Sequence, residues 1–498
     1  MSKDNCILTR TVLWYLVFTG FAINYMIRIN LNIALVAMVK PKPAQNSTIT
    51  SECIATTPKA NLTDVSAERE EIGGFEWTEY QQGLILGAFF WLHWLTQIPG
   101  GMLANKYGTK MVFGLSNFVS VLLCFLIPTV SFIGLEYLII VRLLQGAVAG
   151  CAWPSMHSMT ARWIPPNERS RFVTAYVGSS VGAAVTFALC GVIIHTFGWE
   201  YVFYISGVFG TLWYATWYFF VFDSPIEHPR ISEKEKEYIL DSLGQSVSKE
   251  KPPVPWKAIL TSLPVWSNIF AQIGGLWGLF TVTTNGPMFF KSVHGWNITS
   301  TGFLSALPHL ARMIFAYAFS AYADYLLTAN KMSRTNVRKL AIALCNIGQG
   351  ACMIAMAYSG CNYTLAIVFL TGAIGIHGAT STGALANLVD ISPNYASILL
   401  GMANGSGAIG GFISPLIVGL LTTNNNSVEQ WQKVFWIAAG VLISTGFFFI
   451  TFAKSDLQWW NNPNNRYAEK SNGSELHTLN GKEEKENVDQ LENVDSKR

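Results

Sequence analysis

Charged side chains are scarce in this chain, and acidic ones are missing from the centres of its long apolar stretches. Asp, Glu, Lys and Arg make up 13% of the 498 residues, whereas an ordinary soluble domain carries about 25%. The formal net charge is only +3, and the charges lie in loops and tails rather than along one helix face, so we expect no nucleic-acid partner. This composition is typical of a protein that crosses a membrane several times.

Cysteine motifs and catalytic groups are missing as well. The eight cysteines include no CxxC pair and no zinc-ligand spacing, and no nucleophile–base pair stands out in the apolar stretches or between them. We therefore expect neither an enzyme nor a resident metal or cofactor. Cys53 and Cys361 fall in predicted outside loops, which leaves a disulfide between them open.

Twelve apolar runs are present, each long enough to cross a bilayer, which takes about 20 residues in a helix. In lipid, each run can satisfy its own backbone only as a helix. The first run is too long for a signal peptide and has no small-residue cleavage site, so we interpret it as the first span. The predicted spans are residues 11–39, 80–104, 111–133, 135–161, 172–197, 200–222, 260–290, 301–323, 338–359, 363–389, 395–421 and 433–453.

Two independent signals predict the orientation of these spans. Basic residues gather in alternate short loops, which should be cytoplasmic together with both tails; they are Lys106, Lys110, Arg162, Arg169, Arg171, Lys331, Arg334, Arg338 and Lys339. The N-x-S/T acceptors fall in the opposite set of loops, where we expect glycosylation. These predicted sites are Asn46, Asn61, Asn297, Asn362 and Asn425.

The spans and polar segments predict an all-α membrane protein with twelve transmembrane helices in two six-helix halves. A mixed-charge stretch at 231–243 could form a surface helix in the linker. The tail lacks core-forming residues, so we expect it to be disordered. The predicted parts are a cytoplasmic N-terminus (1–10), an N-terminal bundle (11–222) with a glycosylated outside loop (40–76), a cytoplasmic linker (223–259), a C-terminal bundle (260–453) and a cytoplasmic tail (454–498).

A repeat links the two halves. Residues 166–170 and 393–397 share the pattern Pro-Asn-x-x-Ser, and a Gly-rich span follows each. Residues 199–205 and 431–437 then share Trp-x-x-Val-Phe-aromatic-Ile. Spans five and six therefore resemble spans eleven and twelve, which is the layout of a duplicated secondary transporter with its site between the halves.

Three arginines lie inside predicted spans: Arg28, Arg142 and Arg312. Counted inward from the outer ends they fall at similar depths, roughly 12–16 Å at about 1.5 Å per helical residue. A guanidinium there costs about 2.5–3.5 kcal/mol on insertion scales, and its planar fork suits a carboxylate or phosphate. We predict that the three form a positive, substrate-binding cavity. Snorkelling or backbone contacts for Arg28, and close helix packing around Arg142, are the structural alternatives.

Uncharged polar residues in the spans are candidates for coupling and binding. Histidines could relay protons, because imidazole titrates near neutrality, or could be hydrogen-bonded packing residues; they are His93, His157, His309 and His377. Asn285 and Asn387 offer polar contacts to a solute. Gly286 and Pro287 indicate either a helix break that frees carbonyls for a cation or a simple kink.

Several strings resemble known transporters. Residues 100–110 (Gly-Gly-x-Leu-Ala-Asn-Lys-x-Gly-x-Lys) resemble the loop signature of the major facilitator superfamily, and 323–325 (Ala-Asp-Tyr) resemble its second copy. More specific are 89–91 (Phe-Phe-Trp), 96–101 (Thr-Gln-Ile-Pro-Gly-Gly), 163–170 (Trp-Ile-Pro-Pro-Asn-Glu-Arg-Ser) and 395–399 (Tyr-Ala-Ser-Ile-Leu). These look like the anion:cation symporter family, which comprises sialin, the vesicular glutamate transporters and the type I sodium–phosphate cotransporters.

The resemblance implies the major facilitator fold and alternating access, with an anion coupled to protons or sodium. The first-span and fourth-span arginines of the family fall on Arg28 and Arg142. The resemblance implies that these two are substrate or gating residues. The coupling and gating candidates are His93, His377, Lys106, Glu168, Arg169 and Asp324. No family role carries over to Arg312.

Three positions depart from the family pattern. Ala149 stands where proton-coupled vesicular members carry a glutamate, and residues 274–277 (Gly-Gly-Leu-Trp) lack the arginine that vesicular glutamate transporters place before the Trp. His93 falls on their span-two tyrosine. The pattern favours the phosphate-cotransporter or general organic-anion branch over glutamate transport.

We therefore predict a monomeric secondary transporter that moves phosphate or a small organic carboxylate together with a cation. Sodium is favoured, because no interior carboxylate is available to carry a proton. The alternatives are a proton-coupled lysosomal or vesicular exporter of acidic sugars or amino acids, and a non-transporting membrane sensor. The membrane is either the plasma membrane or that of a lysosome or vesicle.

Overall fold

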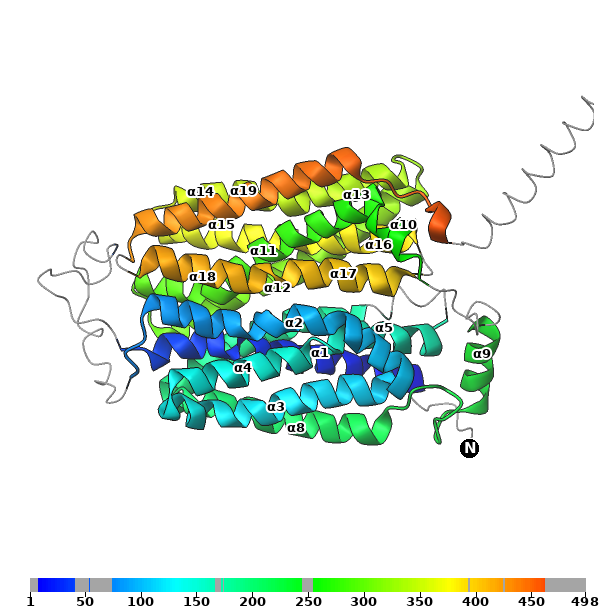
Figure 1. The fold of residues 1–498 in the computed structure, drawn as a ribbon, viewed down its shortest axis with the longest axis horizontal. Helices are drawn as coiled ribbons and strands as arrows, with labels where there is room; N and C mark the ends of the chain where they lie inside the picture. The colour runs from blue at the N-terminus through cyan, green and yellow to red at the C-terminus, as the bar shows by residue number, and fades with distance from the viewer. Residues whose placement is uncertain are drawn as a thin grey trace, which may run out of the picture.

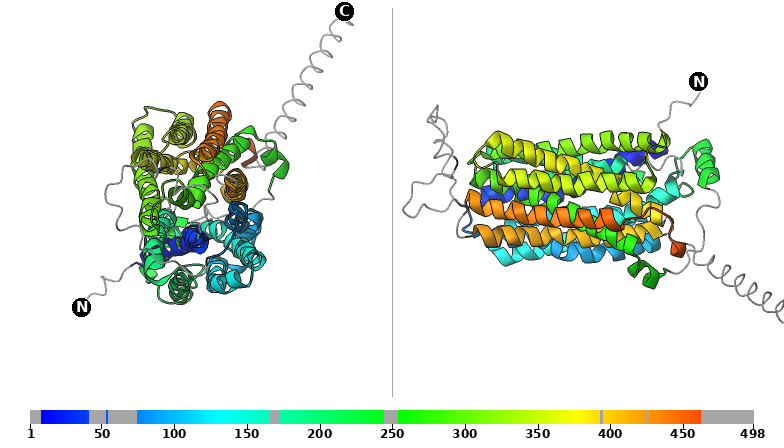
Figure 2. Two further views of the ribbon diagram at one scale, coloured as in Figure 1. Left: turned by 90° about the vertical axis from the view of Figure 1, so that its left-hand side faces the viewer. Right: turned by 90° about the horizontal axis from the view of Figure 1, so that it is seen from above.

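The computed structural model describes residues 8–40, 53, 74–165, 172, 174–243, 254–392, 395–423 and 426–461. This part of the chain is almost entirely helical, and its one isolated β-bridge joins Val39 to Phe75. Figure 1 shows the long helices lying side by side in two groups, one formed by the chain up to α8 and the other by the chain from α11 onward. The end-on view in Figure 2 shows both groups as bundles.

The N-terminal bundle holds six spans, of which the fourth is broken at Gly150 into α4 and α5. A 3-10 turn, η2 (Thr174–Val177), leads into the fifth. Its helices are α1 (Thr9–Met38), α2 (Glu79–Tyr107), α3 (Thr109–Ile133), α4 (Leu135–Ala149), α5 (Ala152–Trp163), α7 (Gly178–Phe197) and α8 (Glu200–Phe220).

The C-terminal bundle repeats this plan with more breaks. A π-helical turn, η4 (Ala343–Gly348), interrupts the third span of this bundle, and a 3-10 turn, η5 (His377–Ser381), interrupts the fourth. The helices are α11 (Leu263–Ser292), α12 (Ile298–Thr328), α13 (Arg334–Ile342), α14 (Gln349–Ala357), α15 (Tyr363–Ile376), α16 (Ala384–Ile391), α17 (Ala396–Ala408), α18 (Gly410–Thr422) and α19 (Val428–Phe452).

The prediction of twelve spans is confirmed, although hydropathy alone would miss some of them. Nine helical segments of the described residues are long and apolar enough to cross a membrane by composition. Three more long helices, α2, α8 and α11, lie among them and bring the total to twelve. Helix α8 is rich in Tyr and Trp, and α11 carries buried amides and hydroxyls, so both have a lower hydropathy than a purely aliphatic span.

The most extensive contacts between the two bundles are those of α2 with α18 and of α7 with α12. Glycines allow the backbones to come close there, as is common between membrane helices. A Cβ on Gly83 would lie 2.5 Å from the Pro415 carbonyl oxygen, and one on Gly302 would lie 2.5 Å from the Phe187 carbonyl oxygen. Within the bundles, α1 packs along α7 and α11 along α17, which places the repeated spans in equivalent positions.

A disulfide joins Cys53 to Cys361 on the side predicted to face outward, the pairing that the sequence left open. It connects the loop after α1 to the turn before α15, 308 residues later in the chain. Lys40 N and Phe75 N also donate to the carbonyls of Phe75 and Met38, at 3.0 and 2.7 Å, and hold the base of that loop. Disulfides persist in oxidising compartments, so this bond agrees with the orientation that the basic loops and sequons predict.

On the opposite side, the linker forms the surface helix that its mixed charges allowed, α9 (Glu233–Leu243). Glu235 accepts hydrogen bonds from the backbone nitrogens of Thr9 and Arg10, at 2.9 and 3.1 Å, and pairs with Arg10 Nε at 3.1 Å. A carboxylate at this position complements the exposed N–H groups and positive dipole end of α1. The linker therefore anchors the start of the first span.

The C-terminal tail begins later than predicted. Residues 454–461 pack against the C-terminal bundle instead of belonging to a disordered tail, and they end in a short 3-10 turn, η7 (Trp459–Asn461). Trp460 is 1% exposed, and its indole supplies apolar burial that the composition of the whole tail concealed. The rest of the predicted tail lies outside the described residues.

Candidate functional site

Arg28 lies in the middle of α1 and is 6% exposed. Aromatic rings surround its guanidinium: the Tyr25, Phe89 and Phe90 ring centroids lie 5.0, 5.3 and 5.5 Å from Cζ. Phe90 in turn contacts Phe280 of α11, with ring centroids 4.7 Å apart. The guanidinium therefore lies in the N-terminal bundle, directly beside the aromatic contact that joins the two bundles. Cation–π contacts stabilise the charge in part, but they do not neutralise it.

The side chain of His93 in α2 forms a hydrogen bond with Arg28. Its Nε2 lies 2.8 Å from Arg28 Nη2, and its Nδ1 lies 3.2 Å from the Gly146 carbonyl oxygen. A carbonyl oxygen only accepts, so Nδ1 must donate, which leaves the Nε2 lone pair to accept from the guanidinium. His93 is thus neutral in this arrangement, and a second proton on it would break the bond to Arg28.

Arg142 of α4 lies beside Arg28 but uses its N–H groups differently. Its Nη1 donates to Gln145 Oε1 at 2.7 Å and to the Ile27 carbonyl at 3.4 Å, and its Nη2 donates to the Arg28 carbonyl at 3.2 Å. Gln145 in turn donates to the Ser120 carbonyl at 2.9 Å. Arg142 is 1% exposed. Its guanidinium joins α4 to the backbone of α1 at the turn that carries Arg28.

Arg312 of α12 belongs to a second polar group. Its Nη1 donates to Ser180 Oγ of α7 at 3.3 Å, so this arginine reaches from one bundle to the other. His309, one turn earlier, stacks on the Phe187 ring, with centroids 5.7 Å apart. His377 is fully buried, and neither of its ring nitrogens has a hydrogen-bond partner. The predicted arginines therefore lie in two groups, Arg28 with Arg142 and His93, and Arg312 with His309 and His377.

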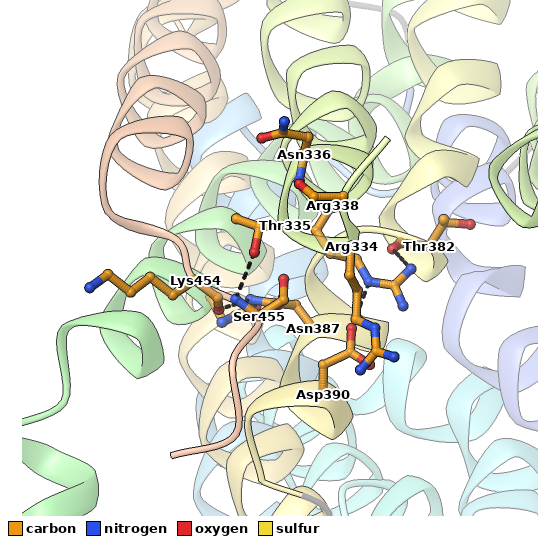
Figure 3. A network of polar contacts seen from close by, with 11 residues as sticks. Arg334, Thr335, Asn336, Arg338, Thr382, Asn387, Asp390, Lys454 and Ser455 are labelled. Atoms are coloured by element: carbon orange, nitrogen blue, oxygen red, sulfur yellow. Dashed lines mark hydrogen bonds and ion pairs between the residues drawn. The ribbon is translucent and has the colours of Figure 1, made fainter. Parts of the chain in front are cut away.

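The two predicted asparagines lie apart from one another. Asn285 is buried in α11, and its Nδ2 donates to the Thr281 carbonyl of its own helix at 3.2 Å. Asn387 lies at the end of the C-terminal bundle that the basic loops predict to face the cytoplasm, where Figure 3 shows it beside Ser455 and Lys454. It accepts from Ser455 Oγ at 2.7 Å and donates to the Lys454 carbonyl at 3.3 Å. The structure does not bring Asn387 to either arginine group.

The cytoplasmic gating candidates are only partly described. Lys106 and Asp324 are exposed, and the Lys106 ammonium lies 5.1 Å from the Tyr107 ring centroid. Glu168, Arg169 and the side chain of His157 lie outside the described residues. The structure therefore shows no contact of Lys106 or Asp324 with either arginine group.

An ion pair that was not predicted from the sequence lies at the same end of the C-terminal bundle as Asn387. Arg338 Nε lies 2.8 Å from Asp390 Oδ2, and Arg338 Nη1 donates to the Thr382 carbonyl at 2.8 Å (Figure 3). Arg334 is a more distant partner of Asp390, at 3.9 Å. Asp390 is the one acidic residue between Cys361 and Glu429, and that isolation was the available signal.

Two of the predicted glycosylation sites lie within the described residues. Asn297 and Asn362 are exposed, and each caps the start of a helix, α12 and α15 respectively. Asn46, Asn61 and Asn425 lie outside the described residues. Glycosylation at all five stays a prediction.

A hydrogen bond between the two bundles was also not predicted from the sequence. Asn32 Nδ2 of α1, one turn after Arg28, donates to the Thr283 carbonyl of α11 at 3.1 Å. That carbonyl has no intrahelical donor, because residue 287, four positions later, is a proline without an N–H. The proline was visible in the sequence, but its partner on the other bundle was not.

Two six-helix bundles with a buried guanidinium beside their contact are typical of a secondary transporter. The sequence profile of the Major Facilitator Superfamily matches residues 17–335. The chain belongs to this superfamily, and within it to the family that includes sialin, the vesicular glutamate transporters and proteins described as inorganic phosphate cotransporters. The expectation that it is not an enzyme is confirmed.

The relatives cover almost the whole chain. Human sialin is 36% identical over 91% of this chain and 91% of its own length. A Drosophila melanogaster protein named "Putative inorganic phosphate cotransporter" is 35% identical over 92% of this chain and 88% of its own. Vesicular glutamate transporter 1 of Xenopus tropicalis is 38% identical over 91% and 76%.

Solved structures support the fold. The crystal structure of a D-xylose–proton symporter matches with a TM-score of 0.62 at 15% identity, covering 90% of this chain and 98% of that one. A bacterial homologue of the human lysosomal transporter Spinster, in an inward-facing and occupied conformation, matches with a TM-score of 0.59 at 14% identity, covering 91% and 98%. At such identities the likeness concerns the fold alone.

Proposed function

We propose that this chain is a symporter that moves a small anion, inorganic phosphate or a small organic carboxylate, together with sodium by alternating access. Arg28 is the anion-binding group. The observation that carries the proposal is that Arg28 is buried beside the contact between the bundles and has a neutral histidine as its side-chain partner. None of the ion pairs found among the described residues involves Arg28 or Arg142.

The electrostatics of the site favour an anion. A guanidinium within a span costs about 2.5–3.5 kcal/mol on insertion scales. A second guanidinium beside it, that of Arg142, raises the local positive charge further. A carboxylate or phosphate would offset both charges and could accept two parallel hydrogen bonds from Arg28. Arg142 supports the site by holding the backbone of α1, since its Nη1 and Nη2 groups donate to the Ile27 and Arg28 carbonyls and to Gln145.

The relatives support the substrate class. Their names refer to sialic acid, glutamate and inorganic phosphate, all of which are anionic. We place phosphate or a small carboxylate first, because residues 274–277 of this chain (Gly-Gly-Leu-Trp) lack the arginine that vesicular glutamate transporters are expected to carry before the Trp. Sodium is placed first as the coupling ion, because no carboxylate lies within the spans near Arg28. The plasma membrane and a lysosomal membrane both fit the outer disulfide.

A proton-coupled exporter is the second candidate, favoured by one contact. His93 accepts directly from Arg28, so protonation of His93 would change how that guanidinium is held. In this version, a proton on His93 replaces sodium as the coupling ion.

Uptake into proteoliposomes tests the proposal and separates the two versions. Radiolabelled phosphate, sialate, glutamate and a small dicarboxylate are each supplied under a sodium gradient at equal pH, and under a pH gradient without sodium. Sodium-driven uptake of one of these anions is expected. Uptake of none under either gradient would contradict the transporter assignment, and uptake under the pH gradient alone would favour the proton-coupled version.

A further inference from the structure

Two hydrogen bonds between the N-terminal and C-terminal bundles lie on opposite sides of Arg28. Asn32 Nδ2 of α1 donates to the Thr283 carbonyl of α11 at 3.1 Å, and Arg312 Nη1 of α12 donates to Ser180 Oγ of α7 at 3.3 Å. Asn32 and Ser180 are both buried, so the two bonds form away from bulk water. Each of them must break if the bundles separate at that level.

The packing of α1 against α7 gives the depth of each bond. Asn32 follows Arg28 by one turn of α1, about 6 Å toward the side predicted to face outward. Helix α7 runs parallel to α1, and a Cβ on Gly182 would lie 2.5 Å from the Ala22 Cα. Ser180 is therefore level with residue 20, which lies about 12 Å from Arg28 toward the side predicted to face the cytoplasm. The anion site thus lies between the two bonds.

The outer bond depends on a proline. Pro287 has no N–H, so the Thr283 carbonyl lacks its usual helical donor. The amide of Asn32 takes the place of that donor across the contact between the bundles. A buried carbonyl is seldom left without a donor, so this bond favours contact between the bundles on the outer side. When the bundles separate there, water can replace the amide, and the bond can therefore break reversibly.

The inner bond pairs a charged donor with a neutral acceptor. Its length of 3.3 Å exceeds the usual value of about 2.9–3.0 Å. A guanidinium binds a carboxylate or phosphate more strongly than it binds a hydroxyl such as that of Ser180. None of the ion pairs found among the described residues involves Arg312. This bond can therefore give way to water or to an anion without the separation of an ion pair.

With both bonds formed, Arg28 is closed off on both sides. Its side chain is 6% exposed, and the Phe90 and Phe280 rings, with centroids 4.7 Å apart, fill the space between the bundles beside it. In alternating access, the site opens to one side while it stays closed to the other. A bond between the bundles on each side of the site is the arrangement that such a cycle requires.

We propose that Asn32 and the Thr283 carbonyl form the outer gate of the path to Arg28, and that Arg312 and Ser180 form its inner gate. This inference rests on the proposed function, because it assigns gates to the same anion site. It gives Arg312 a role that differs from that of Arg28. An anion that leaves Arg28 toward the cytoplasm meets the Arg312 guanidinium and displaces Ser180 from it, which opens the inner gate.

Cysteine labelling of the purified full-length protein, without any anionic substrate, tests the two gates. Two buried glycines on opposite sides of Arg28 are suitable reporter positions. A Cβ on Gly286 of α11 would meet only Val282 Cγ1, and one on Gly401 of α17 only Ile98 Cγ1 of α2, each at 3.9 Å. Gly286→Cys reports on the outer side and Gly401→Cys on the inner side. Reaction with a water-soluble maleimide is followed at each reporter by peptide mass spectrometry, so the native cysteines stay in place.

Loss of one gate should expose one reporter. Asn32→Leu removes the donor of the outer gate, and Pro287→Ala restores a helical N–H that competes for the same carbonyl. Each should raise the rate of labelling at Gly286→Cys by about threefold or more, as expected for the loss of a neutral hydrogen bond, without raising it at Gly401→Cys. Ser180→Ala should have the reverse effect and raise the rate at Gly401→Cys alone by a similar factor.

Matched controls lie in the same two helices. Asn30→Leu in α1 and Ser179→Ala in α7 remove polar groups that bond within the N-terminal bundle, to Cys124 Sγ at 3.3 Å and to the Tyr176 carbonyl at 2.8 Å. Neither control should change the labelling of either reporter. The inference is overturned if the gate variants label like these controls. It is also overturned if each gate variant raises both reporters equally, because that result indicates general loosening of the fold.

Uptake measurements separate this inference from the proposed function. If labelling is specific to one side in each gate variant but the unaltered protein takes up no anion, the gates stand and the anion-transport proposal fails. If the unaltered protein takes up an anion but the gate variants show no preference for one reporter, anion transport stands and the two gates are overturned.

Discussion

Arg142 Nη2 donates to the backbone carbonyl of Arg28 across 3.2 Å, so the two guanidiniums that look equivalent in the sequence act on different atoms. Arg142 holds the backbone of α1, whereas the Arg28 guanidinium is held by His93 and by three aromatic rings. In the proposed function, Arg142 is therefore a positioning residue and Arg28 is the group that binds the anion. The two roles predict different outcomes when each side chain is replaced.

Arg142→Met should lower stability more than Arg28→Met does. The Arg142 change removes three hydrogen bonds from a charged group and strands Gln145 Oε1, at a cost of about 1.5–3 kcal/mol for each well-formed charged bond. The measurement is the melting temperature in detergent, together with the rate and half-saturation of anion uptake. A melting temperature that is unchanged in Arg142→Met but lowered in Arg28→Met would reverse the two roles.

His93→Gln and His93→Phe should differ in uptake. The Gln carbonyl oxygen can accept from Arg28 Nη2 as the imidazole does, whereas Phe fills the space without an acceptor. We expect His93→Gln to retain uptake and His93→Phe to lose at least about tenfold, the factor that corresponds to 1.4 kcal/mol. Equal uptake by both variants would mean that this hydrogen bond does not position Arg28.

The disulfide predicts that the two bundles are covalently linked on the outer side. A protease site inserted between α9 and α10 (Trp256–Leu260) separates the chain into two halves. After cleavage, the halves should stay joined through Cys53 and Cys361 on a non-reducing gel and separate after reduction. The same protein with Cys361→Ser is the control, and it should separate without reductant. If the two halves of the protein with both cysteines intact separate without reductant, the disulfide is contradicted.

The Arg338–Asp390 pair should stabilise the cytoplasmic end of the C-terminal bundle. The two side chains are 11% and 16% exposed, so water screens the pair only in part, and Asp390→Asn should cost about 1–3 kcal/mol. A double-mutant cycle with Arg338→Met gives the coupling between the two residues, which should exceed about 0.5 kcal/mol. Additive effects of the two changes would show that the pair contributes little.

Much of the architecture could be predicted because lipid leaves few choices. A run of about 20 apolar residues must be a helix, and the basic loops and sequons then orient the helices. Arg28 could be singled out because an isolated charge in an apolar run is costly to place in a membrane, and such residues usually have a function. The repeat could be found because its matches are Pro, Asn, Trp and Phe, which are not interchangeable with other apolar residues.

The details of the site could not be predicted, because a span that is apolar on all sides does not reveal how it is rotated. The partners of Arg142 are backbone carbonyls, which leave no mark in a sequence. Asn387 looked like a site residue but binds the segment after α19, which composition had assigned to a disordered tail.

Anion uptake by the Arg28→Ala variant is the most direct test of whether Arg28 binds the transported anion. Radiolabelled uptake of the transported anion is compared between Arg28→Ala, Arg28→Lys and the control Lys433→Ala, whose side chain is exposed in α19, at equal amounts of reconstituted protein. If Arg28 binds the anion, Arg28→Ala abolishes uptake and the control is unaffected. Arg28→Lys retains a small fraction of uptake, because a point charge replaces a planar group that donates two parallel hydrogen bonds. Normal uptake by Arg28→Ala would contradict this role of Arg28.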